Sequence, residues 1–215
     1  LAGGQSNMEL PMCFDLTYEE ERAACADDAL RFYDVPEISY VGQDQEADYS
    51  VYSVWRRSTP EDLARFSATA YHFAKALRRR LEVPVGIIGC NWGGTPACAW
   101  MSRDAIVAGG GLVFLDEYDR NFRSNPANFH TDLLADPVGN MMFAGATPAD
   151  VGPVFQRLAL KMEFQPPVMG PKYERRPSGL YQSMLLPLVP YALRGVIWYQ
   201  GETDGDTHPD LYATL

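Results

Sequence analysis

Histidine is scarce in this sequence, which has only three histidines in 215 residues, His72, His130 and His208. A mechanism that needs a histidine base must use one of these three or a residue outside the chain. His72 falls beside the apolar face of a predicted helix, which favours a structural role. His130 falls in an Asn- and Asp-rich stretch typical of an exposed loop. His208 precedes a proline and suits a helix cap, with a role as general base as the alternative.

The sequence also lacks the cysteine patterns of metal sites, because it has no Cys-x-x-Cys pair and no histidine at the spacing of a metal ligand. We therefore expect buried free thiols, with one disulfide as the alternative, and neither a metal nor an organic cofactor. Unpaired thiols favour a reducing compartment such as the cytoplasm. The four cysteines are Cys13, Cys25, Cys90 and Cys98.

Long apolar runs are missing as well. No run approaches the roughly 20 residues needed to cross a bilayer, so we predict no membrane-spanning helix. No signal peptide is recognisable, but the chain begins at Leu1 rather than at methionine, so we expect an upstream segment to be missing and the residues present do not specify targeting.

Basic residues are nearly missing from the first 50 positions, which hold 12 Asp and Glu against Arg22 and Arg31. Residues 51–215 hold 16 acids and 16 bases, so the whole net charge of -10 lies in the first segment. Such a field repels polyanions, which excludes DNA or RNA as the expected partner.

The remaining composition is that of a globular chain, with 47% hydrophobic and 21% charged residues. The length predicts one domain, covering residues 1–215. Apolar runs at residues 1–2, 30–35, 49–55, 84–89 and 195–199 predict strands, and helical patterns lie between several of them. This alternation predicts an α/β fold with a parallel sheet and helices on both faces.

Three helices can be placed from local signals. Residues 18–30 are acidic and Ala-rich, and residues 180–193 are apolar and helix-like despite two prolines. Thr59 followed by Pro60 is a typical helix start, and apolar residues then recur at helical spacing as far as Leu81. Phe73 belongs to the apolar face of that predicted helix.

Polar, Gly-containing turns follow three of the predicted strands, at residues 3–8, 91–95 and 200–203. Ligands of parallel sheets bind beyond the carboxyl ends of the strands, so we expect these turns to meet.

Ser6 is a candidate nucleophile, with a role as helix N-cap as the alternative. Gly93 and Gly94 could offer an oxyanion donor or simply form a tight turn. Gln200 is a candidate hydrogen-bond donor, with a solvated loop as the alternative.

These same residues resemble a known family, the sialate O-acetylesterases of the SGNH (GDSL-like) hydrolase superfamily. The resemblance lies in four blocks in the family's order: residues 4–9 (GQSNME), 66–74, 92–101 (WGGTP and AWM) and 180–202, which ends in WYQGE. It covers nearly the whole chain, with residues 102–165 the least similar.

The resemblance implies a three-layer α/β/α, flavodoxin-like fold and a serine esterase that removes O-acetyl groups from a carbohydrate. Ser6 would be the catalytic nucleophile. The N–H groups of Ser6 and Gly94 and the side chain of Gln200 would form the oxyanion hole, and Glu202 would support the Ser6 turn through its N–H groups. No cofactor or metal is implied.

The sequence departs from the family in one respect, since it contains no Asp-x-x-His block. We therefore expect the catalytic His and Asp to lie beyond Leu215, and the domain to be incomplete in this chain. A sialic acid substrate would also need an arginine for its carboxylate, for which Arg56, Arg103 and Arg123 are the candidates. An acetylated neutral sugar such as a xylan side group, and a non-catalytic carbohydrate-binding module, are the alternatives.

Overall fold

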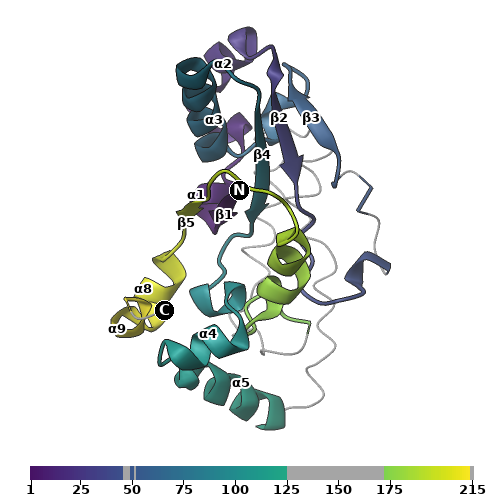
Figure 1. Cartoon of the computed structure of the whole chain (residues 1–215). Helices are drawn as coiled ribbons and strands as arrows, with labels where there is room; N and C mark the ends of the chain where they lie inside the picture. The colour runs from purple at the N-terminus through teal and green to yellow at the C-terminus, as the bar shows by residue number, and fades with distance from the viewer. Residues whose placement is uncertain (46–48, 51, 125–171, 214–215) are drawn as a thin grey trace, which may run out of the picture.

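A mostly parallel β-sheet forms the centre of the molecule in the computed structural model, which describes residues 1–45, 49–50, 52–124 and 172–213 (Figure 1). Within these residues the sheet has five strands in the order β3-β2-β4-β1-β5. The strands are β1 (Ala2–Gly4), β2 (Asp27–Asp34), β3 (Trp55–Ser58), β4 (Val85–Asn91) and β5 (Ile197–Tyr199). The α-helices are α1 (Ser6–Glu9), α2 (Tyr18–Ala24), α3 (Ala68–Leu81), α4 (Arg103–Ala108), α5 (Leu112–Ser124), α8 (Glu202–Thr207) and α9 (Pro209–Tyr212).

Each face of the sheet is covered by its own hydrophobic layer. On one face, Phe32 of β2 and Ile87 of β4 pack in a cluster with Tyr71 of α3. On the other face, Cys90 of β4 packs with Trp100 and with residues that precede β5. Figure 1 shows α3 and the green segment before β5 on opposite sides of β4. The predicted α/β/α architecture is therefore confirmed.

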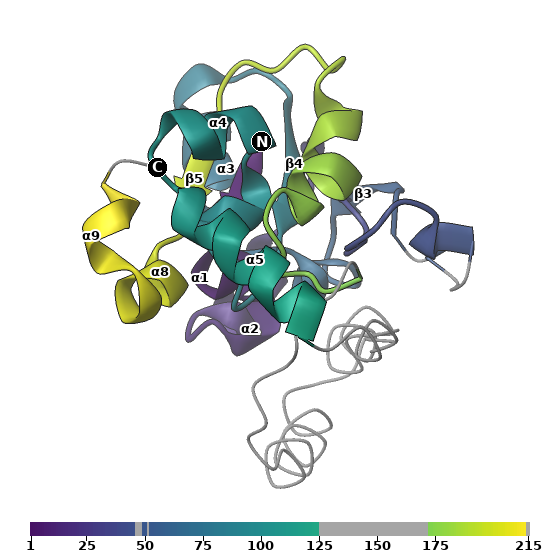
Figure 2. The ribbon, with the colours of Figure 1, turned by 90° about the horizontal axis from the view of Figure 1, so that it is seen from below.

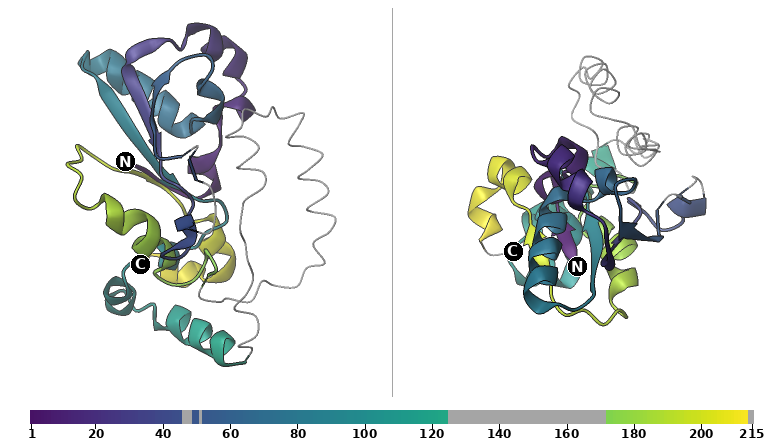
Figure 3. Two further views of the ribbon diagram at one scale, coloured as in Figure 1. Left: turned by 90° about the vertical axis from the view of Figure 1, so that its right-hand side faces the viewer. Right: turned by 90° about the horizontal axis from the view of Figure 1, so that it is seen from above.

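Among the five strands of the described residues, β3 alone departs from the parallel arrangement, since it pairs antiparallel with β2. β3 follows β2 without an intervening α-helix in the described residues, and a parallel neighbour would need a crossover connection. β1 lies between β4 and β5, and both views of Figure 3 accordingly show the N-terminus among the strands.

The boundaries of several elements differ from those the sequence predicts. The helix predicted at residues 18–30 ends at Ala24, because residues 27–30 belong to β2 and pair with neighbouring strands. The strand predicted at residues 49–55 begins only at Trp55. Residues 181–188 form a π-helical turn and a 3₁₀ turn rather than a longer helix.

The helix predicted from Thr59 begins nine residues later. Residues 63–65 form a single 3₁₀ turn, and Phe66 is then extended and stacks on Phe32 with ring centroids 3.9 Å apart. The N–H of Met12 bonds to the carbonyl of Phe66, so tertiary pairing interrupts the helical pattern at this point. Phe73, predicted to be buried, is 41% exposed.

Helix α3 begins at a buried cap. The Ser67 hydroxyl accepts a hydrogen bond from the N–H of Ala70 at 3.0 Å and donates one to the carbonyl of Met8, so it joins α3 to α1.

Replacing Ser67 with alanine removes both bonds, and we expect the free energy of unfolding to fall by about 2 kcal/mol. Denaturant unfolding measures the change. Ser102, which caps α4 at an exposed position, is the matched control, and an equal loss in Ser102→Ala would contradict this account.

Candidate active site

The three predicted turns meet at one edge of the sheet. Gly4 of β1 pairs with Asn91 of β4 and with Tyr199 of β5, and all three strands run parallel. The turns that follow them therefore leave the sheet side by side. Figure 2, seen from below, looks toward this end of the sheet, with α4 and α5 in front.

Ser6 lies where β1 turns into α1. Gly4 has φ +142°, and a Cβ at this position would lie 1.9 Å from the carbonyl oxygen of Tyr199, so only glycine fits. Gln5 is buried at the N-cap, and its N–H bonds to the Tyr199 carbonyl at 3.0 Å. Ser6 is thus the first helical residue rather than the cap, and its side chain is exposed. This geometry presents the hydroxyl outward on a fixed backbone.

The turn after β4 lies against Ser6. A Cβ on Gly93 would lie 3.6 Å from the Cβ of Ser6 and 2.8 Å from a carboxylate oxygen of Glu9, and Gly94 has φ +71°. Within the described part of the chain, neither the N–H of Ser6 nor that of Gly94 donates to a protein acceptor. Two backbone donors beside an exposed hydroxyl are the elements of an oxyanion hole.

The side chain of Gln200 connects the three turns. Its side-chain nitrogen lies 3.2 Å from the side-chain oxygen of Gln5 and 3.2 Å from the carbonyl of Thr95, and it also donates to Asp204. Its two hydrogens are therefore engaged with protein acceptors, which gives this side chain a positioning role in the structure. A direct role in holding an oxyanion stays a prediction.

Glu202 contacts the residue that follows Ser6, and its role in supporting the Ser6 turn stays a prediction. Its carboxylate accepts a hydrogen bond from the side-chain amide of Asn7, not from backbone N–H groups. The bond connects α8 to the residue that follows Ser6.

Asp204 is a residue that the sequence analysis missed. It is fully buried in the first turns of α8, and its carboxylate accepts from the N–H of Ala97 at 2.9 Å and from Gln200. Asp204 thereby connects the segment after Gly94 to the turn after β5. The only signal in the sequence is an acidic residue shortly after the third block, which resembles an ordinary helix start.

The three arginines predicted to bind an anionic sugar lie on β3, α4 and α5. Arg56 pairs with Asp62 at 3.2 Å, Arg103 is exposed in the first turn of α4, and Arg123 falls in α5. A different arginine of the described residues, Arg175, lies at the glycine turn, and its guanidinium Nη2 is 2.5 Å from the position of a Cβ on Gly94. Sequence spacing gives no reason to choose it.

Neither of the two described histidines contacts Ser6. The ring of His72 lies 3.4 Å from Asp15, and that of His208 lies 3.3 Å from Glu117 and packs edge-on against Phe114. His130 lies outside the described residues. Both described histidines are therefore engaged with carboxylates rather than with Ser6.

The cysteines are free and buried, as predicted. Burial raises the pKa of Cys90 and of Cys98 to about 12, so these thiols are poor nucleophiles at neutral pH. A search of the described residues finds no cluster of His, Cys, Asp and Glu that could hold a metal ion. The described helices also include none long and apolar enough to cross a membrane.

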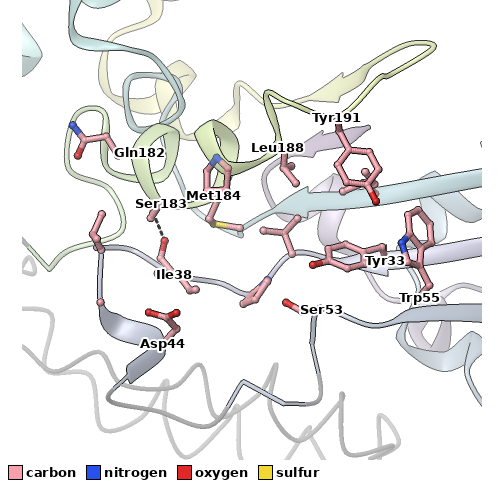
Figure 4. Close-up of a pocket in the computed structure, with 16 residues that line it drawn as sticks. Tyr33, Ile38, Asp44, Ser53, Trp55, Gln182, Ser183, Met184, Leu188 and Tyr191 are labelled. Atoms are coloured by element: carbon pink, nitrogen blue, oxygen red, sulfur yellow. Dashed lines mark hydrogen bonds between the residues drawn. The ribbon is translucent and has the colours of Figure 1, made fainter.

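A cavity of about 450 Å³ lies on the face of the sheet covered by the segment before β5 (Figure 4). Figure 4 shows Tyr33 and Trp55 on one side and Gln182 and Asp44 on the other. None of the predicted site residues lines it, so this cavity does not mark the place of the proposed chemistry.

Comparison with known proteins supports the resemblance seen in the motifs. No protein-family model matches the chain. The chain is 28% identical over 224 residues to the sialate O-acetylesterase of Rattus norvegicus, covering 100% of this chain and 36% of that protein. It is 28% identical to the sialate O-acetylesterase of Homo sapiens, covering 99% of this chain and 32% of that protein. The chain thus spans about a third of the length of the curated relatives it matches.

A solved structure is similar as well. The crystal structure of a carbohydrate acetylesterase from Xanthomonas citri superposes with a TM-score of 0.58 at 25% identity, covering 99% of this chain and 36% of that one. The chain therefore resembles the sialate O-acetylesterases along its full length, and the predicted resemblance and fold are confirmed.

Proposed function

We propose that this protein is a serine esterase that removes O-acetyl groups from a carbohydrate, with Ser6 as the nucleophile. The observation that carries the proposal is the exposed hydroxyl of Ser6 beside two unbonded backbone N–H groups. The full-length similarity to sialate O-acetylesterases and to a carbohydrate acetylesterase supports the choice of an acetyl ester.

In the proposed mechanism, the Ser6 oxygen attacks the acetyl carbonyl while a general base takes the hydroxyl proton. The N–H groups of Ser6 and Gly94 stabilise the oxyanion that forms. The sugar oxygen then leaves with that proton, and an acetyl-Ser6 ester remains. Water attacks this ester in the same way and releases acetate. Gln200, Asp204 and Glu202 hold the turns in place throughout.

We propose that the general base and its acidic partner lie outside the described residues. His72 and His208 are engaged with carboxylates away from Ser6, and the relatives are about three times as long as this chain. No step of the proposed chemistry needs a metal or an organic cofactor.

We propose an O-acetylated sialic acid as the substrate, because the curated relatives are named for it. An acetylated neutral sugar such as a xylan side group is the alternative within the same reaction. The four free thiols support a reducing compartment.

A panel of acetyl esters tests the proposed function. The protein is expected to release acetate from O-acetylated sialic acid or from acetylated xylo-oligosaccharide, and to hydrolyse p-nitrophenyl acetate. A serine-directed phosphonate should label the peptide that contains Ser6. A second candidate, a carbohydrate-binding module without catalysis, is favoured by the position of the two described histidines, and it predicts saccharide binding with no labelling of Ser6.

A further inference from the structure

Arg175 and Ser6 flank the same pair of glycines. The turn at Gly93 and Gly94 places its first residue against Ser6 and its second against the guanidinium of Arg175. Gly94 has no side chain, so the guanidinium can approach the backbone to a distance that a Cβ would forbid, 2.5 Å from the Cβ position. The positive charge of Arg175 therefore lies near any ligand whose ester group contacts Ser6.

Two of the residues that follow Arg175 are anchored to other parts of the fold. Ser178 donates its N–H to the carbonyl of Cys98 at 2.8 Å, and Arg176 donates from its guanidinium to the carbonyl of Ser39 at 3.1 Å. Arg176 therefore serves the fold, whereas its neighbour is directed to the glycine turn. An anchored loop lowers the entropy cost of holding the Arg175 side chain ready for a ligand.

Within the described ranges, no hydrogen bond uses the donors of Arg175. Its buried Nε has no hydrogen-bond partner among the described residues, and 42% of its side chain is exposed. The nearest carboxylate oxygen, on Glu174, lies 3.9 Å from Nε, which is too far for a hydrogen bond. The guanidinium of Arg175 therefore places a positive charge with unfilled donors at the site.

The carboxyl group of Glu174 competes only weakly with a ligand anion for the guanidinium of Arg175. Burial raises the pKa of its carboxyl group, although the nearby Arg175 acts in the opposite direction. The other carboxylate at the glycine turn, on Glu9, faces Gly93 and not Gly94. An anion supplied by a ligand can therefore engage Arg175 without displacing a bonded partner.

We propose that Arg175 binds the carboxylate of an acidic sugar and makes the site selective for anionic over neutral acetylated substrates. The proposal rests on the proposed function, and it specifies the substrate class of that site. The planar guanidinium can offer two parallel N–H donors to a carboxylate, which a lysine cannot do. Arg175 is thus a specificity-determining residue, and the chemistry remains with Ser6.

The test compares a mono-O-acetylated N-acetylneuraminic acid with the methyl ester of its carboxyl group. These two substrates carry the same acetyl group and differ in charge. We expect the wild-type protein to prefer the free acid by about 10- to 100-fold in kcat/KM, a range set by the strength of charge-assisted hydrogen bonds. Arg175→Gln should bring this ratio close to one, and Arg175→Lys should leave an intermediate ratio. Arg103→Gln, an exposed arginine on α4, is the matched control and should keep the wild-type ratio.

Three outcomes overturn the proposal: a wild-type ratio near one, an unchanged ratio in Arg175→Gln, or an equal loss of the ratio in Arg103→Gln. Hydrolysis of p-nitrophenyl acetate by the wild-type protein tests the esterase activity separately, because this ester carries no carboxylate. If that activity fails, calorimetric titration with N-acetylneuraminic acid and with its methyl ester still tests Arg175. Binding of the free acid that is weakened at least tenfold in Arg175→Gln would then support the anion site.

Discussion

Replacing Ser6 with alanine should reduce acetate release by at least about 10⁴-fold without unfolding the protein. The loss is this large because the covalent route disappears with the nucleophile, and only the rate supplied by binding and by the oxyanion donors remains. Ser6 is exposed and its hydroxyl bonds to no described protein group, so its removal should change the free energy of unfolding by less than about 0.5 kcal/mol. Turnover of acetylated substrate and denaturant unfolding, measured on the same preparation, separate the two effects.

Ser102→Ala is the control for this experiment, because it makes the same chemical change at the cap of α4. We expect it to keep full turnover and to lose about 1 kcal/mol of stability, the reverse of the Ser6 result. Undiminished turnover in Ser6→Ala would exclude Ser6 as the nucleophile. Unfolding of Ser6→Ala would instead require repetition with cysteine at this position, where turnover should also collapse while the fold is kept.

The part of the site that could be predicted from sequence is the part that local chain geometry determines. A Gly-rich turn after a short apolar strand predicts an exposed Ser6, and pairing with Tyr199 of β5 holds that turn in place. Parallel pairing of β1 with β4 and β5 then brings the turns at Gly94 and Gln200 to the same edge. Alternating strands and helices imply this arrangement before any contact is known.

The contacts that escaped prediction join residues far apart in the chain. Asp204 bonds to Ala97, which lies 107 positions earlier in the chain. Arg175 lies against Gly94, and no sequence motif links these two residues. The start of α3 was misplaced for the same reason, since Phe66 leaves the helical path to stack on Phe32. Local propensity cannot report an interaction whose partner lies in another element.

Replacing Asp204 with alanine should lower the free energy of unfolding by about 3 kcal/mol. The change leaves the N–H of Ala97 without an acceptor in a fully buried place and removes one of the three acceptors of the Gln200 amide, and an unpaired buried donor costs about 1–3 kcal/mol. Asp204→Asn keeps one carbonyl oxygen as an acceptor and should lose about half as much. Denaturant unfolding of the two variants measures the difference.

The same substitution should also lower the rate of acetate release. Asp204 connects the segment after Gly94 to Gln200, and the side chain of Gln200 contacts Gln5, the residue before Ser6. A shift of about 1 Å in one of these turns can cost about 100-fold in rate, so we expect kcat/KM for acetate release to fall toward that limit in Asp204→Ala. Asp206, an exposed acid on the same helix, is the matched control, and Asp206→Ala should change neither quantity. Wild-type stability and turnover in Asp204→Ala would show that the glycine turn keeps its place without the buried carboxylate.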